Sequence, residues 1–198
     1  GNIGIILKIF DNGATDQAMA GLPLEVLTVD ANNKVVKRKT LNWNKYLKYS
    51  PFSYYIKQTA EKEELFFNDS PNVVIEKAYT YDSYGLKKSS STTDSKGVTV
   101  IQDMSYAYQY YSFVNDKNML SFPYQTTTKV NNQIVNVVQS KWINDNGKVY
   151  LNENWSGPST SSLRLNSQIS KVEPSGNVLE SNNGKGFYNT VLFGYDNL

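Results

Sequence analysis

Turn-forming residues recur at short intervals along the sequence, and they constrain the fold more than any other feature. Clusters of Asn, Asp and Gly separate runs rich in Thr, Val, Tyr, Phe and Ile, which are the residues favoured in β-strands. The turn clusters are DANNK (30–34), NNQ (131–133), NDNG (144–147), PSGN (174–177) and NNGKG (182–186). No segment keeps a helical period for more than about three turns. The pattern predicts an all-β fold of roughly 10 to 14 strands, in which consecutive antiparallel hairpins form a curled open sheet or partial barrel.

The length of the chain fits a single domain over residues 1–198. In residues 21–43, apolar residues alternate with others on either side of the DANNK turn, which predicts an N-terminal hairpin. Residues 58–67, QTAEKEELFF, contain helix formers with early glutamates, so we expect a long loop or at most one short helix there. Residues 44–72 as a whole are expected to form an irregular connection. Residues 73–198 are expected to form further hairpins.

The sequence contains no cysteine and no histidine, which excludes several kinds of site. A disulfide, a thiolate nucleophile, a zinc site with Cys or His ligands and a Ser-His-Asp triad all require one of these residues. A calcium loop that starts at Asp30 would need a glutamate at the position occupied by Leu41. We therefore expect neither a metal nor a cofactor.

The charge balance argues against a nucleic-acid partner. The chain has 20 Lys plus Arg and 18 Asp plus Glu, and its only arginines are Arg38 and Arg164. Nucleic-acid binders concentrate basic residues, and arginine supplies their bidentate contacts. No apolar run reaches the roughly 18 residues of a membrane span. The first ten residues, GNIGIILKIF, lack the basic region and cleavage site of a signal peptide.

The block YTYDSYG (79–85) predicts a tight structural turn. Asp82 can accept hydrogen bonds from backbone amides further along the turn, and Gly85 can adopt a positive φ. The same reasoning predicts structural roles for Gly97 and Gly176 in later turns. Tyr79 and Tyr81 would share one face of a strand. We expect YAYQYY (106–111) to supply the neighbouring strand, with Tyr106, Tyr108 and Tyr110 on one face.

These motifs resemble those of bacterial RHS-like proteins, particularly the Bacteroidetes type. YTYDSYG is similar to their YD repeat, PSGNVLE (174–180) to the start of a following strand, LFGYDN (192–197) to a further YD unit and NMLSFPYQTTTKVNNQIVNVVQSKW (118–142) to a linking hairpin. The similarity covers roughly residues 73–198, and it fits the hairpin at 21–43 more loosely. It implies a repeated β-hairpin scaffold and an extracytoplasmic location, at the cell surface or secreted.

The favoured functional hypothesis is a non-enzymatic β-scaffold or protein-interaction module. An open sheet has two strand edges that must be covered or used in pairing, so the expected partner is another protein or a second copy of the chain. Lys34, Lys37 and Lys39 are expected to protect one of these edges.

Two alternative functions stay open. Trp43, Trp142 and Trp155 are candidate binding aromatics for a carbohydrate-binding module, in which sugar rings stack on exposed indoles; the competing interpretation places them in the core. A glycosidase would need a pair of carboxylates, for which the candidates are Glu61, Glu63, Glu64, Asp94, Asp103, Asp145 and Glu153. Of these, only Glu153, beside Trp155, has an aromatic context that would favour a raised pKa. We therefore assign no catalytic residue.

Overall fold

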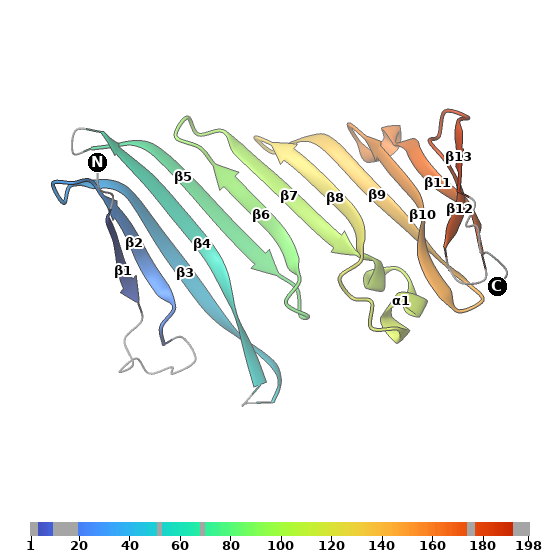
Figure 1. The fold of residues 1–198 in the computed structure, drawn as a ribbon, viewed down its shortest axis with the longest axis horizontal. Coiled ribbons are helices and arrows are strands. Elements are labelled where there is room, and N and C mark those ends of the chain that lie inside the picture. Colours follow the sequence, from blue (N-terminus) through green and yellow to red (C-terminus); the bar gives the residue numbers. More distant parts are fainter. Residues whose placement is uncertain (1–3, 10–19, 51–52, 68–69, 174–176, 192–198) are drawn as a thin grey trace, which may run out of the picture. The chain divides into compact units, whose positions relative to one another are not determined.

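The computed structural model describes residues 4–9, 20–50, 53–67, 70–173 and 177–191. Their strands form one open antiparallel sheet of 13 strands, whose order in the sheet is their order in the sequence (Figure 1). The prediction of an all-β fold built from consecutive hairpins is confirmed. Although the sequence predicts a single domain, the sheet divides into two compact units. Residues Gly1–Gln102 with Val130–Asn132 form unit 1, and residues Asp103–Lys129 with Gln133–Leu198 form unit 2.

Unit 1 contains the first six strands and the start of the seventh. They are β1 (Gly4–Ile9), β2 (Pro23–Val29), β3 (Val35–Ser50), β4 (Ser53–Phe67), β5 (Ser70–Tyr81), β6 (Lys87–Thr93) and β7 (Thr99–Tyr106). β2 and β3 form the hairpin predicted for residues 21–43, and β3 extends beyond its predicted end. β1 pairs along one side with β2 and is the first strand in the order of the sheet.

Residues 58–67 belong to strand β4, so the prediction of a short helix or long loop there is wrong. Along β4, Glu63 lies opposite Lys39 of β3, and Glu61 lies opposite Lys77 of β5. Pairs of opposite charge on neighbouring strands stabilise a sheet, and here they outweigh the local helix preference of the glutamates. The irregular connection expected over residues 44–72 is also wrong, because its described residues lie in β3, β4 and β5.

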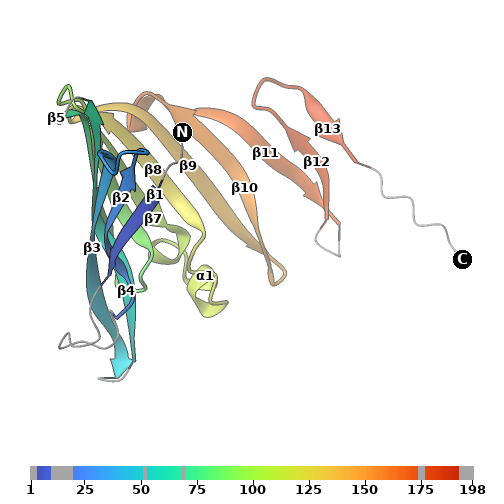
Figure 2. The ribbon, with the colours of Figure 1, turned by 60° about the vertical axis from the view of Figure 1, so that its left-hand side comes forward.

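Unit 2 takes in the end of β7 and the remaining strands (Figure 2). They are β8 (Pro123–Val130), β9 (Gln133–Asp145), β10 (Lys148–Gly157), β11 (Arg164–Val172), β12 (Val178–Asn182) and β13 (Tyr188–Thr190), with helix α1 (Ser112–Asp116) and the 3₁₀ turns η2 (Ala107–Gln109) and η3 (Thr160–Ser162). The predicted strand at 106–111 is wrong, because Tyr106 ends β7 and η2 follows directly. None of the described helices has the length and apolar character needed to cross a membrane.

The hydrophobic core of the described residues is thin. The buried apolar side chains are Val29, Leu41, Ala107, Val114 and Val137. Most other residues of the sheet are half-buried, as expected for strands whose faces are only partly covered. Hydrogen bonds, ion pairs and aromatic contacts across the strands therefore carry much of the side-chain packing.

Candidate functional site

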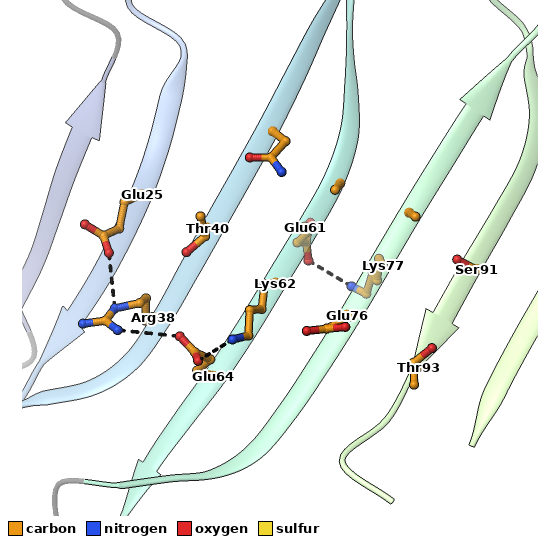
Figure 3. Close-up of a pocket in the computed structure, with 13 residues that line it drawn as sticks. Glu25, Arg38, Thr40, Glu61, Lys62, Glu64, Glu76, Lys77, Ser91 and Thr93 are labelled. Carbon is orange, nitrogen blue, oxygen red and sulfur yellow. Dashed lines mark hydrogen bonds and ion pairs between the residues drawn. The ribbon is translucent and has the colours of Figure 1, made fainter. Parts of the chain in front are cut away.

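A groove crosses one face of strands β2 to β6 in unit 1 (Figure 3). Its volume is about 640 Å³. Asn42, Ala60, Ala78 and Ser91 face one another in register across four strands and provide small side chains along the groove. The next row is longer and more strongly charged, and consists of Glu25, Thr40, Lys62, Glu76 and Thr93. We call this feature the charged groove.

The charges of the groove largely neutralise one another. The Nε of Arg38 lies 3.2 Å from Glu25 Oε1, and its Nη1 lies 3.7 Å from Glu64 Oε2. Lys62 Nζ lies 2.9 Å from the other oxygen of Glu64. The Arg38 Nε is buried and its contact with Glu25 lacks hydrogen-bond geometry, so this pair is electrostatic. The guanidinium also stands 5.3 Å from the ring centre of Phe66, which supports it from one side.

Glu61, one of the carboxylates singled out in the sequence, is held by three donors. Its carboxylate lies 3.1 Å from Lys39 Nζ and 3.0 Å from Lys77 Nζ, and it accepts a hydrogen bond of 3.0 Å from Gln58. Its side chain is only 7% exposed. Burial by itself raises the pKa of Glu61, but the hydrogen bonds from Gln58, Lys77 and Lys39 outweigh burial and hold the pKa below its ordinary value.

Glu153 occupies a similar environment in unit 2. It lies 2.9 Å from Lys141 Nζ and accepts a hydrogen bond of 2.7 Å from Trp155 Nε1. The bond from Lys141 lowers the pKa of Glu153; burial opposes this, and the bond from Trp155 adds to it, so the pKa is below its ordinary value. The raised pKa that the neighbouring Trp155 suggested is therefore wrong. A glycosidase general acid needs a raised pKa, so neither Glu61 nor Glu153 fits that role.

The other five candidate carboxylates also have partners within the protein. Their contacts are Glu63 with Lys37, Glu64 with Arg38 and Lys62, Asp103 with Lys129, Asp94 with the backbone amides of Lys96 and Val98, and Asp145 with the Asn146 side chain. Among the described residues, no three Asp or Glu side chains are grouped so that they could hold a metal ion. Asp30 instead caps its turn, because it accepts the N–H groups of Asn32 and Lys34.

The edge-protecting role predicted for the lysines is wrong where the structure tests it. Lys37 and Lys39 lie on β3, between β2 and β4 in the sheet, and they pair with Glu63 and Glu61. Lys34 lies in the turn before β3, where its N–H bonds to Asp30. Lys37 and Lys39 therefore stabilise the interior of the sheet rather than its edge.

The three tryptophans are half-buried, and each uses its indole N–H within the protein. Trp43 donates to the carbonyl of Pro23 at 2.8 Å, and Trp142 donates to the carbonyl of Pro123 at 2.8 Å. Trp142 also stacks on a phenylalanine, with ring centres 4.4 Å apart, and Lys141 Nζ stands 4.8 Å from the ring of Trp155. Trp43 belongs to unit 1, and Trp142 and Trp155 belong to unit 2.

The turn residues singled out in the sequence form a tight loop between β5 and β6. Asp82 Oδ1 accepts the N–H of Tyr84 at 2.9 Å and the N–H of Leu86 at 2.8 Å, while Gly85 adopts a φ of 77°. The turn that follows β6 has the same build: Asp94 is its cap, and Gly97 has a φ of 78°. Gly176 and the whole LFGYDN segment lie outside the described residues.

A cluster of tyrosines packs beside the first of these turns, and sequence reasoning missed it. Tyr46 stacks on Tyr55 with ring centres 5.2 Å apart and meets Tyr81 edge-on at 6.1 Å. The Tyr81 hydroxyl donates to the Gln58 carbonyl at 2.7 Å. A Cβ placed on Gly85 would approach the Tyr55 ring within 2.9 Å. The glycine of the YD block thus permits both a positive φ and close aromatic packing.

The first and last strands of the sheet expose apolar side chains. On β1, Ile5, Ile6 and Leu7 are 70%, 51% and 61% exposed. At the other end of the strand order, Phe187, which directly precedes β13, and Tyr188, its first residue, are 71% and 63% exposed. Successive residues of a strand point to opposite faces, so the described residues leave β1 exposed on both faces as well as along one edge. The apolar run IIL beside a single lysine was the sequence signal for this strand.

The chain was also compared with known proteins. No protein-family model matches it, and no curated protein shows detectable similarity to it.

Proposed function

We propose that the chain is a non-enzymatic β-scaffold that associates with other proteins through the strand edges of its sheet. The observation that carries this proposal is β1, a six-residue edge strand with one side unpaired among the described residues and three exposed apolar side chains. An uncovered, apolar edge presents backbone donors and acceptors that can add a strand from another chain. The resemblance to RHS-like proteins supports an extracytoplasmic location for this scaffold.

The carboxylates also support a structural role. Glu61 and Glu153 have lowered pKa values and are held by lysines, so they remain ionised where a catalytic acid would have to carry a proton. Both lie between neighbouring strands, where they join three strands through side-chain bonds. In a sheet with a thin hydrophobic core, such links stabilise the scaffold itself.

Light scattering over a range of protein concentrations tests the proposal. We expect the mass to rise above the 22.4 kDa of one chain as concentration increases, because uncovered β1 edges pair. The variant Ile6→Lys places a charge on the edge and should keep the protein at the mass of one chain. The control Ile134→Lys changes a similarly exposed residue on β9, which has a neighbouring strand on each side. A constant single-chain mass for the unmodified protein would contradict self-association through β1 and would leave a strand of another protein as the partner to test.

Carbohydrate binding is the second candidate, and an aromatic cluster in unit 2 favours it. Tyr110 is an exposed residue that stacks on Tyr124 at 3.8 Å, and the amide of Gln139 donates to the Tyr124 hydroxyl at 3.1 Å. An exposed ring beside amide groups is the composition that sugar-binding surfaces use. Titration of soluble polysaccharides, followed by tryptophan fluorescence, tests this: a saturable shift that Tyr110→Ala abolishes would establish the glycan site in place of the scaffold.

A further inference from the structure

The sequence contains an internal repeat with a period of about one hundred residues. DQAMAGLP (16–23) and DKNMLSFP (116–123) share the spacing D-x-x-M-x-x-x-P. Each is followed by a strand, a turn rich in asparagine and a second strand that contains a tryptophan, Trp43 in the first copy and Trp142 in the second. In this repeat, β2 corresponds to β8, and β3 corresponds to β9.

The geometry of the two copies agrees with the repeat. In both, the indole N–H donates 2.8 Å to the carbonyl of the proline that begins the preceding strand, from Trp43 to Pro23 and from Trp142 to Pro123. In both, the next strand carries a glutamate that lies in register with a long polar side chain on the strand after it. These cross-strand pairs are Glu61 with Lys77 and Glu153 with Gln168. In the repeat, β4 therefore corresponds to β10, and β5 corresponds to β11.

Continued in both directions, the correspondence matches β1 with β7 and β6 with β12. β7 pairs with β8 on one side, as β1 pairs with β2. On its other side β7 pairs with β6, and a hydrogen bond of 2.9 Å joins the Thr93 and Thr99 hydroxyls there. The same side of β1 has no partner among the described residues. The chain itself thus shows what kind of strand fits this edge.

The strand that holds this place beside β7 is polar throughout, since β6 has the sequence KKSSSTT. β12, which pairs in the same way with β13, has the sequence VLESN, which is apolar in its first two residues and polar in the last three. β6 covers one edge of β7, and the side chain of Val100 on β7 is 36% exposed. On β1, the side chains of Ile5, Ile6 and Leu7 are 51% to 70% exposed. Short serine and threonine side chains let the backbones pair without competing with the bulky residues of the strand they join.

We infer that the edge of β1 that no described residue covers is a binding site for one extended, serine- and threonine-rich strand of a partner protein, with the chemistry of β6. The inference rests on the proposed function and names the partner of the same edge. The strand adds antiparallel to β1, so that backbone hydrogen bonds supply most of the affinity. Ile5, Ile6 and Leu7 then pack against the hydroxyl-bearing side chains on both faces.

A synthetic peptide with the sequence of residues 86–94, LKKSSSTTD, tests the inference in trans. A fluorescent label on the peptide allows its anisotropy to be followed as the full chain is added. We expect saturable binding that Ile6→Lys weakens about tenfold, because the introduced charge stands on the edge and repels the lysines of the peptide. Ile134→Lys is the matched control and should bind like the unmodified chain. A peptide with Ser91→Pro, which lacks one backbone donor, should bind more weakly than its parent.

The outcomes separate the inference from the proposed function. Binding that depends on Ile6, together with a fall in the scattering mass of the chain when peptide is added, supports both. If the chain self-associates through β1 but the peptide neither binds nor lowers its mass, the edge prefers a second copy of β1, and the inference is overturned while the proposed function stands. If the chain stays at single-chain mass and no peptide binds, both are overturned. Peptide binding that Ile6→Lys leaves unchanged also overturns the inference.

Discussion

The two units carry the same structural element with different charges around it. In unit 1, Glu61 lies between two lysines and is 7% exposed; in unit 2, Glu153 lies between Lys141 and the amide of Gln168, and is 17% exposed. The hydrogen bond from tryptophan to proline, by contrast, has the same length in both. The difference teaches that the backbone contact of the tryptophan defines the repeat, while the ion pairs around the glutamate vary.

Substitutions of glycine in the tight turns are expected to give the largest difference in stability loss between the two units. Gly85 and Gly186 both have a positive φ, but a Cβ on Gly85 would meet the Tyr55 ring at 2.9 Å, whereas a Cβ on Gly186 would meet nothing. Gly85→Val should therefore lower the free energy of unfolding by about 3 kcal/mol, and Gly186→Val by about 1 kcal/mol. Urea denaturation measures both. Equal losses of unfolding free energy would show that the Tyr55 ring moves aside at no cost in stability.

Substitution of the two glutamates tests whether a buried carboxylate contributes more to stability in unit 1 than in unit 2. Glu61→Ala leaves Lys39 and Lys77 without their shared partner and should cost about 2 kcal/mol of unfolding free energy, less than a fully buried pair because both lysines are partly exposed. Glu153→Ala should cost about 1 kcal/mol, because it releases one lysine, one indole N–H and the long hydrogen bond from Gln168. A larger loss for Glu153→Ala than for Glu61→Ala would reverse the comparison.

Replacing the tryptophans tests what the units share. Trp43→Phe and Trp142→Phe keep an aromatic ring and remove the N–H that bonds to the proline carbonyl. Each should cost about 1 kcal/mol, the ordinary loss for one half-buried hydrogen bond. Thermal and urea unfolding should show nearly the same loss of stability for the two variants. If only one variant loses stability, the bond is not the common element of the repeat.

The sequence predicted those parts of the fold that local chemistry determines. Asp82, Gly85 and Gly97 lie in tight turns because carboxylate caps and a positive φ are properties of a few consecutive residues. The hairpin at 21–43 followed from alternation on both sides of one turn. The extended form of residues 58–67 did not, because it depends on lysines of β3 and β5 that pair with the glutamates of β4.

Contacts between distant segments also explain what was missed at the candidate site. Tyr81 was expected to meet the tyrosines of 106–111, but it meets Tyr46, which the long β3 and β4 strands bring to the turn. The charged groove was not foreseen, because its small residues become a row only once four strands are in register. Register is decided by the whole sheet rather than by any single strand.

The smallest expected effect is the pH dependence of stability. The pKa of Glu61 is lower in the folded chain than its ordinary value, so its ionised form adds stability that is fully present above the ordinary pKa and is lost as pH falls through the folded pKa. The pKa of Lys77 is raised, chiefly by its hydrogen bond to Glu61, so its contribution is present below the ordinary pKa of lysine and is lost as pH rises through the folded value. The pair therefore stabilises the sheet across the range between these limits.

Glu61→Gln removes the titrating group and keeps the side-chain shape, so the variant isolates this effect. Between about pH 6 and about pH 3, the unfolding free energy of the unmodified chain should fall more steeply than that of Glu61→Gln. The variant should also lose the decline above the ordinary pKa of lysine that the Lys77 pair contributes. Glu153→Gln should flatten the acid limb as well, because the pKa of Glu153 is also lowered, but it should leave the alkaline limb that belongs to Lys77 unchanged. Parallel profiles for the unmodified chain and Glu61→Gln would mean that Gln58 and the two lysines do not lower the pKa of Glu61 in the folded chain.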